Sequence, residues 1–245
     1  MAVRAVVVLC WLLCCGAAGA DQLDEILAAN AAAIGGNANW SRVANLRLEL
    51  SIREPGSEVE GTYVASRDGS MRIDIMAGGK KVFAEGLNQG KAWEWQPGKG
   101  KTAAGADAAA ALRNGIEMPG KFFTLQQVRD RGVHIELVDS DEAAAAGQWQ
   151  LRLTLEDGFG SDFFVDRHTH LVVRSRDVRA FHPSIDPTEA VIETSYTGEV
   201  WTEGVLRQPE STNRNLTTDT WLGTTTIRSI EQNIDIPEGF FRGPR

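Results

Sequence analysis

Beyond residue 20 the sequence contains no cysteine. All three cysteines of the 245-residue chain, Cys10, Cys14 and Cys15, lie in the N-terminal segment. A domain without thiols can form neither a disulfide nor a zinc site built on thiolates. The fold must therefore be stabilised by packing and hydrogen bonds alone.

The sequence also lacks an excess of positive charge. It has 25 Lys and Arg against 33 Asp and Glu, which gives a formal net charge of −8, and it contains no long basic run. Nucleic acids and anionic membrane surfaces are bound by positively charged surfaces, so we expect neither as a partner. No apolar stretch after residue 20 is long enough to cross a bilayer.

Motifs that carry enzyme chemistry are missing as well. There is no G-x-S-x-G, no phosphate-binding loop and no H-E-x-x-H. His168 and His170 could share one face of a strand, but a metal site needs a third ligand and none is evident. Asp157, Asp162 and Asp166 do not have the spacing of a calcium loop. We therefore expect a protein without cofactor or metal that is not an enzyme.

The N-terminal segment 1–20 resembles a bacterial secretory signal. Arg4 precedes an apolar core at residues 6–15, and Ala18 to Ala20 form a small-x-small cleavage site. Cleavage there would start the mature chain at Asp21, with 225 residues (245 minus 20) and a charge of −9 after loss of Arg4. The predicted location is the periplasm. Lipidation at Cys15 is the minor alternative.

Helical periodicity is confined to a few stretches. Apolar residues recur every three or four positions in residues 21–36, before Gly35 and Gly36 end the pattern. Residues 103–112 are rich in alanine and favour a helix, and residues 121–132 form a second short candidate. These helices offer little bulky apolar surface.

Most of the remaining chain alternates between apolar and polar residues. Leu46, Leu48 and Leu50 set this period of two, and it returns in segment after segment until about residue 230. The pattern predicts a mainly β fold of about eleven antiparallel strands. No linker interrupts residues 21–245, which we interpret as one domain. Its tail, residues 237–245, is expected to be frayed.

The stretch at residues 80–98 is the most distinctive of these β segments. Two short strands flank a turn at residues 87–90, and Pro97 and Gly98 end the second strand. Trp93 and Trp95 are two apart, so both leave the same face of the sheet. The pair could belong to an ordinary core hairpin or form the wall of an apolar pocket.

So many strands with so few helices leave an apolar sheet face to cover. A wide sheet hides such a face by curling on itself. Incomplete curling would leave an apolar cavity lidded by short helices, suited to an acyl chain or another greasy ligand. A filled core without a cavity is the alternative.

These segments together resemble the periplasmic lipoprotein-carrier group, the LolA-like family of outer-membrane lipoprotein-sorting proteins. The likeness starts at the helix ending in Ile34, Gly35 and Gly36 and runs through Ser66–Arg72. It is clearest in the hairpin, where Gly86, Gly90, Trp93, Trp95 and Pro97 resemble the family's pattern. It continues through residues 153–158, 164–166 and 169–171 to the closing strands around Tyr196, Gly198, Gly204, Val205 and Pro209.

The resemblance implies an incomplete antiparallel β-barrel, lidded by helices over an apolar cavity, in a carrier that is not an enzyme. By this likeness Arg67 is the arginine that latches the lid to helix backbone, although Asp68 stands where the family usually has proline. The expected lining residues are Trp93, Trp95, Phe83, Met71, Ile73 and Phe123.

The implied ligand is a lipid or the acyl chains of a lipoprotein, carried between envelope membranes by a monomer. An inner-membrane transporter would be the donor and an outer-membrane protein the acceptor. The alternative function is an envelope sensor or scaffold that uses the same fold to bind a protein partner. An enzyme acting on a lipid or glycan is a third reading, and the sequence offers no convincing acid–base pair for it.

Overall fold

The structure, a computed structural model that describes residues 14–244, is dominated by one antiparallel sheet of thirteen strands. Its strand order is β6-β5-β4-β3-β2-β1-β15-β14-β11-β10-β9-β8-β7, and β12 and β13 form a separate pair. The strands are β1 (Asn45–Glu54), β2 (Ser57–Ser66), β3 (Met71–Ala77), β4 (Lys80–Asn88), β5 (Lys91–Gln96), β6 (Gly100–Ala103), β7 (His134–Val138), β8 (Gln148–Thr154), β9 (Gly160–Asp166), β10 (Val172–Arg179), β11 (Ala190–Thr197), β12 (Val200–Thr202), β13 (Val205–Arg207), β14 (Glu210–Asn215) and β15 (Thr220–Gln232).

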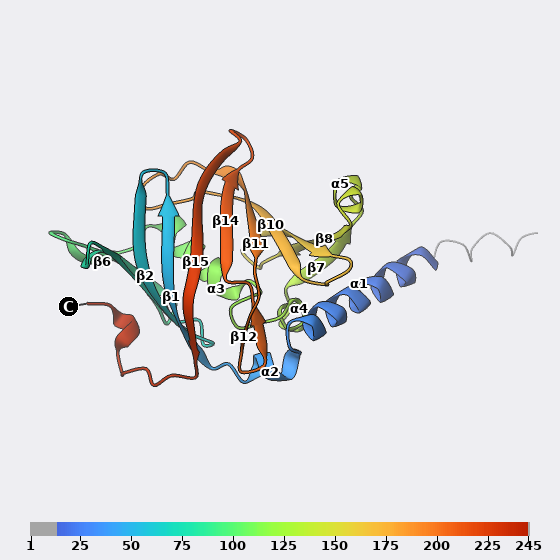
Figure 1. Cartoon of the computed structure of the whole chain (residues 1–245), viewed down its shortest axis with the longest axis horizontal. Coiled ribbons are helices and arrows are strands. Elements are labelled where there is room, and N and C mark those ends of the chain that lie inside the picture. The colour runs from blue at the N-terminus through green and yellow to red at the C-terminus, as the bar shows by residue number, and fades with distance from the viewer. Residues whose placement is uncertain (1–13, 245) are drawn as a thin grey trace, which may run out of the picture.

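The sheet consists of two runs, β1 to β6 and β7 to β15 without β12 and β13, which meet where β1 pairs with β15 (Figure 1). It curls strongly, but its edge strands β6 and β7 do not pair within the described residues, so the barrel is not closed. This confirms the predicted mainly β, incomplete barrel. The structure has more strands than the predicted eleven, and one of them, β6, ends at residue 103, where a helix was expected to begin.

The period of two in β1 determines which face of the sheet is buried. Leu46, Leu48 and Leu50 point to the inside of the curl, while Arg47 and Glu49 between them pair on the outer face. On β2, Ala65, Tyr63 and Gly61 lie opposite these leucines and continue the inner face. Alternation thus places one apolar side of each strand against the helices.

Five α-helices and one short 3-10 helix lie in the described chain: α1 (Cys14–Ala33), α2 (Asn37–Ser41), α3 (Ala106–Glu117), α4 (Leu125–Asp130), α5 (Asp141–Ala145) and η1 (Phe240–Arg242). Helix α1 contacts α4 and β7, and α3 contacts β4 and β5. The first helix was expected at residues 21–36. It already includes Cys14, the first described residue, and it ends at Ala33, shortly before Gly35 and Gly36 with φ angles of 104° and 82°.

The second and third predicted helices are displaced from their expected bounds. Helix α3 starts later than residue 103, because β6 occupies residues 100–103, and it continues to Glu117. Helix α4 is shorter than residues 121–132. Its start is fixed by a capping box, in which the Thr124 hydroxyl accepts from the Gln127 N–H and the Gln127 side chain bonds the Thr124 N–H.

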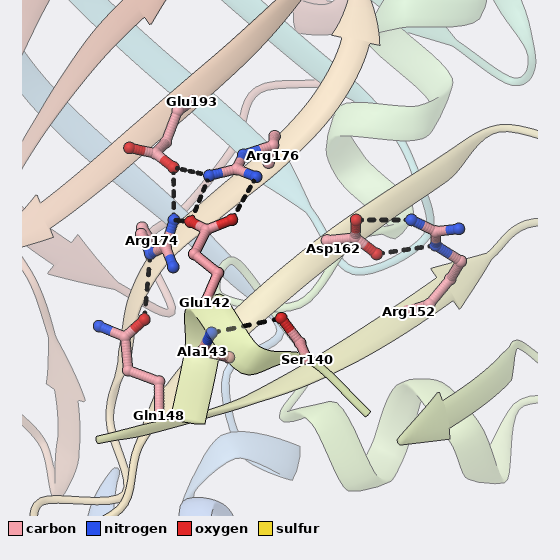
Figure 2. Close-up of polar contacts among 9 residues, drawn as sticks. All are labelled: Ser140, Glu142, Ala143, Gln148, Arg152, Asp162, Arg174, Arg176 and Glu193. Carbon is pink, nitrogen blue, oxygen red and sulfur yellow. Dashed lines mark hydrogen bonds and ion pairs between the residues drawn. The ribbon is translucent and has the colours of Figure 1, made fainter. Parts of the chain in front are cut away.

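Helix α5 lies outside the three stretches that the sequence predicted to be helical. Ser140 is its N-cap, with a hydroxyl that accepts from the Ala143 N–H. Figure 2 shows the Glu142 carboxylate of α5 lying between Arg174 and Arg176 of β10, which also bind Glu193 of β11. The cap and these ion pairs order a five-residue helix that alanine content alone would not hold in water.

The C-terminal segment is ordered, so the prediction of a frayed tail was wrong as well. Helix η1 packs against β4, and the red chain in Figure 1 runs back toward β2 and β6. The Trp93 indole N–H donates to the Phe241 carbonyl oxygen at 2.7 Å, and the Lys101 Nζ donates to the Arg242 carbonyl oxygen at 3.0 Å. A buried indole N–H needs such an acceptor, and the tail supplies it.

The predicted signal segment 1–20 lies largely outside the described residues, which begin at Cys14. Residues 14–20 continue α1 toward the N-terminus. Of the helices within residues 14–244, none combines the length and the hydropathy that a membrane crossing requires.

Candidate ligand-binding cavity

A cavity of about 380 Å³ lies between the inner face of the sheet and the helices above it. Its walls come from α1, α2 and α4, from the sheet strands β1, β2, β9, β10, β11, β14 and β15, and from β13 of the separate pair. The apolar part of the lining includes Ile34, Leu46, Leu48, Leu50, Phe163, Val172 and Ile227. The size and the apolar walls are those of a small-molecule site that would accept a hydrocarbon chain.

The loop at residues 118–124 closes the cavity between α3 and α4, and we call it the lid loop. Pro119, Gly120, Lys121, Phe123 and Thr124 of this loop all contribute to the lining. Its backbone is held by two arginines. Arg67, just after β2, binds the Phe122 carbonyl oxygen at 2.7 Å, and Arg207 of β13 binds the Gly120 carbonyl oxygen at 2.7 Å.

Arg67 also binds helix α2 and the residues after it. Its Nε donates to the Val43 carbonyl oxygen at 2.9 Å, and its Nη2 donates to the Trp40 carbonyl oxygen. The guanidinium lies 4.7 Å from the ring centre of Phe123. Burial and the nearby Arg131 lower the pKa of Arg67. These contacts match the bonds to helix backbone that the sequence resemblance implied, and the latch role itself stays a prediction.

Polar side chains connect α2 to α4. The Thr124 hydroxyl donates to the Asn37 Oδ1 at 2.7 Å, and the Gln127 side chain donates to the Asn37 carbonyl oxygen at 3.1 Å. Gln126 of α4 accepts from the Asn37 amide at 2.8 Å. These hydrogen bonds join α2 to α4, and through Thr124 they also join α2 to the end of the lid loop.

Two cations, Lys121 and Arg207, lie in a lining that is otherwise uncharged. Lys121 Nζ donates to the Gly115 carbonyl oxygen at 2.6 Å and lies 5.8 Å from the ring centre of Tyr63. Burial, with Arg207 and Arg179 as lesser causes, lowers the pKa of Lys121 to about 8. Arg207 is 7% exposed, and burial lowers its pKa to about 10.

Of the six residues predicted to line a pocket, Phe123 lines this cavity. Met71, Ile73 and Phe83 point to the same inner face as Leu48 and Tyr63, because they lie opposite inner-face residues of the neighbouring strands. None of these three residues lines the cavity, and Met71 and Ile73 pack in the hydrophobic core.

Trp93 and Trp95 lie on the other face of the sheet. They pair with Gly86 and Ala84, whereas Glu94 between them pairs with the inner-face residue Glu85. Trp93 is only 6% exposed, because the C-terminal segment covers it. The spacing predicted a shared face, but it could not tell the inner face from the outer one, and neither indole lines the cavity described here.

The cavity contains residues that the sequence reading did not select. Leu46, Leu48 and Leu50 were recognised only as the apolar side of a strand, and Lys121 and Arg207 gave no signal at all. Isolated cations in a chain with 25 Lys and Arg cannot be distinguished from surface residues by pattern. Arg207 reaches the lid loop because β13 pairs with β12 and because the Leu206 N–H donates to the Ile34 carbonyl oxygen just after α1.

Scanning the chain against protein-family models gives no match, and a search of curated proteins gives none either. Solved structures do match. A DUF1329 family protein from Desulfovibrio piger has a TM-score of 0.55 at 10% identity, over 89% of this chain and 96% of that chain.

Two further structures give the same picture. A LolA superfamily protein from Nitrosomonas europaea has a TM-score of 0.55 at 9% identity, over 89% of this chain and 96% of that chain. A domain assigned to outer membrane lipoprotein sorting, from Vibrio parahaemolyticus, has a TM-score of 0.57 at 8% identity, over 89% and 94%. At such low identity the likeness shows the fold alone. The chain has a LolA-like fold.

Proposed function

We propose that this protein is a periplasmic carrier that shields an acyl chain, from a lipid or a lipoprotein, during transfer between envelope membranes. The observation that carries the proposal is the apolar cavity of about 380 Å³ between the curled sheet and its helices. Burial is worth about 25 cal/mol per Å² of apolar surface, so one acyl chain would gain several kcal/mol, enough for reversible binding.

The LolA-like fold and the predicted signal segment support a role in the envelope. An inner-membrane transporter as donor and an outer-membrane acceptor follow from the same proposal. Arg67 would latch the lid, because it joins the lid loop to the residues around α2. The role is binding, with no chemical step assigned to the cavity.

The first test is native mass spectrometry of protein purified gently from its own host, with organic extraction of bound material, followed by titration with a fluorescent fatty acid. A discrete lipid or acylated peptide near one-to-one is the expected result. An empty protein that also fails to take up the fatty acid would refute the carrier and favour a sensor or scaffold that binds a protein partner.

A cavity-filling variant locates the binding site. Ser211 of β14 lines the cavity, so Ser211→Trp should occupy its volume and reduce uptake at least about tenfold. Glu210 precedes it on the same strand, is exposed and points to the opposite face, which makes Glu210→Trp the matched control. Equal uptake by both variants would place the ligand elsewhere.

A further inference from the structure

We propose that the cavity selects amphiphiles with an acidic headgroup, and that Arg207 and Lys121 bind the headgroup while the tail lies on the leucines of β1. This inference rests on the proposed carrier function and adds to it the chemical class of the ligand. The carboxylate of a fatty acid and the phosphate of a lipid share the required chemistry, which is a negative charge with several acceptor oxygens.

Arg207 is the main observation. It lines the cavity, is 7% exposed, and uses Nη1 to bind the Gly120 carbonyl oxygen. Its Nε and Nη2 are buried and have no hydrogen-bond partner among the residues that the structure describes. Its guanidinium lies 4.7 Å from the ring centre of Trp40, which satisfies none of these donors by a hydrogen bond. A buried guanidinium with unused donors is costly unless an anion completes it.

Lys121 provides a second cation in the same lining. An ammonium has three donors, and one of them binds the Gly115 carbonyl oxygen. Arg207 and Arg179 each disfavour the charged form of Lys121, and Arg179, outside the lining, is paired with Asp177 at 2.8 Å. Among the lining residues in the described chain there is no Asp or Glu. The lining therefore holds two cations, Lys121 and Arg207, and no carboxylate.

Other arginines show that this arrangement is unusual within the molecule. Arg67 donates to three carbonyl oxygens, and Arg174 binds Glu142, Glu193 and Gln148. Within residues 14–244, Arg207 alone combines cavity lining with two buried, unused donor groups. A carboxylate or phosphate fits because its oxygens accept from both an Arg fork and a Lys.

The rest of the lining accounts for the tail of the ligand. Leu46, Leu48 and Leu50 form a continuous apolar strip on β1, and Ile227 of β15 lies beside them. A cavity of about 380 Å³ is near the lower end of small-molecule sites, about 300–1,000 Å³. The proposed ligand is therefore an amphiphile with one chain in the cavity.

Calorimetric titration of the full mature chain tests the headgroup with matched probes. Palmitate and hexadecyl phosphate carry the acid, and hexadecanol has the same chain without charge. We expect the two acids to bind about tenfold or more tightly than hexadecanol, since hydrogen bonds to charged groups are strong. Inorganic phosphate alone should bind far more weakly, because it gains nothing from the apolar strip.

Two variants then test the residues. Lys121→Met and Arg207→Gln should each reduce the preference for palmitate over hexadecanol toward one, with little change for hexadecanol. The matched controls are Lys91→Met, at the exposed β4–β5 turn, and Arg47→Gln, on the outer face of β1. Both should keep the preference for palmitate over hexadecanol. Circular dichroism checks folding, and Lys121→Met suffices if Arg207→Gln does not fold.

Each contrary result has a distinct meaning. If hexadecanol binds as tightly as palmitate, or Lys121→Met keeps the full preference, the acidic-headgroup inference is overturned and the carrier proposal stands. If inorganic phosphate binds as tightly as hexadecyl phosphate, the site is for a free anion and the inference is also overturned. If no amphiphile binds, both proposals fail.

Discussion

Gly86 shows how one missing side chain allows the outer face to pack. A Cβ at this position would lie 2.6 Å from the Trp93 ring and 2.7 Å from the Met71 carbonyl oxygen. The backbone atom cannot move aside cheaply, so we expect Gly86→Ala to reduce the free energy of unfolding by about 1–3 kcal/mol. Urea denaturation measures this change.

Gly160 provides the control for that substitution. It also lies in a strand, and its nearest neighbour to an added Cβ would be the Leu153 carbonyl oxygen at 3.8 Å, an ordinary contact. Gly160→Ala should be close to neutral. If both variants lose the same stability, the crowding at Trp93 does not explain the need for glycine at residue 86.

Glu85 is the residue whose titration should most affect stability near neutral pH. Burial, and then the carboxylate of Glu94 directly opposite on β5, raise the pKa of Glu85 from 4.5 to about 7. Between these pH values the folded state binds more protons than the unfolded state, so stability falls as the pH rises from about 4.5 to about 7.

Glu85→Gln should therefore be more stable than the parent by about 1–3 kcal/mol at pH 8, and the difference should vanish near pH 4. Thermal denaturation of both proteins across this range provides the measurement. A difference that does not change with pH would mean that the substitution acts through packing and not through the charge.

At the scale of elements, the lid loop is joined to α2 through Arg67. Arg67→Ala removes the donors for the carbonyl oxygens of Trp40, Val43 and Phe122, and we expect a loss of about 2–4 kcal/mol in unfolding free energy. Amide hydrogen exchange should accelerate first at α2 and at residues 118–124. Exchange that accelerates equally throughout the sheet would show a general structural role instead of a local latch.

Helix α5 depends on its ion pairs with β10. Hydrogen bonds from Arg176 and Arg174 lower the pKa of Glu142 to about 2. The pairing is therefore complete above pH 4.5 and is lost as the pH falls through about 2. Because Glu142 is 54% exposed, Glu142→Gln should cost less than about 1 kcal/mol overall, yet hydrogen exchange at residues 141–145 should accelerate clearly. Unchanged exchange would show that the Ser140 cap is sufficient.

Elements differ in how far their own sequence determines them. Alternation identified most strands and the faces they share, since the period of two reflects burial directly. It could not say that the Trp93 face is the outer one, because that depends on how the sheet curls. Short elements such as α5 and β6 were missed, since caps and pairings formed across distant residues order them. The position of Arg207 in the cavity likewise depends on contacts with residues far away in the sequence, such as the Gly120 carbonyl oxygen.

At the scale of the whole molecule, the cavity lies where the two runs of strands meet, and both β1 and β15 line it. A ligand that binds only the folded state stabilises it by about 2.7 kcal/mol at a hundred times its Kd. We therefore expect palmitate to raise the melting temperature and to slow hydrogen exchange in β1, β15, α1 and residues 118–124 together. Ser211→Trp, with its cavity filled, should lose both effects. If that variant is stabilised as much as the parent, palmitate binds to the exterior and the cavity is not the carrier site.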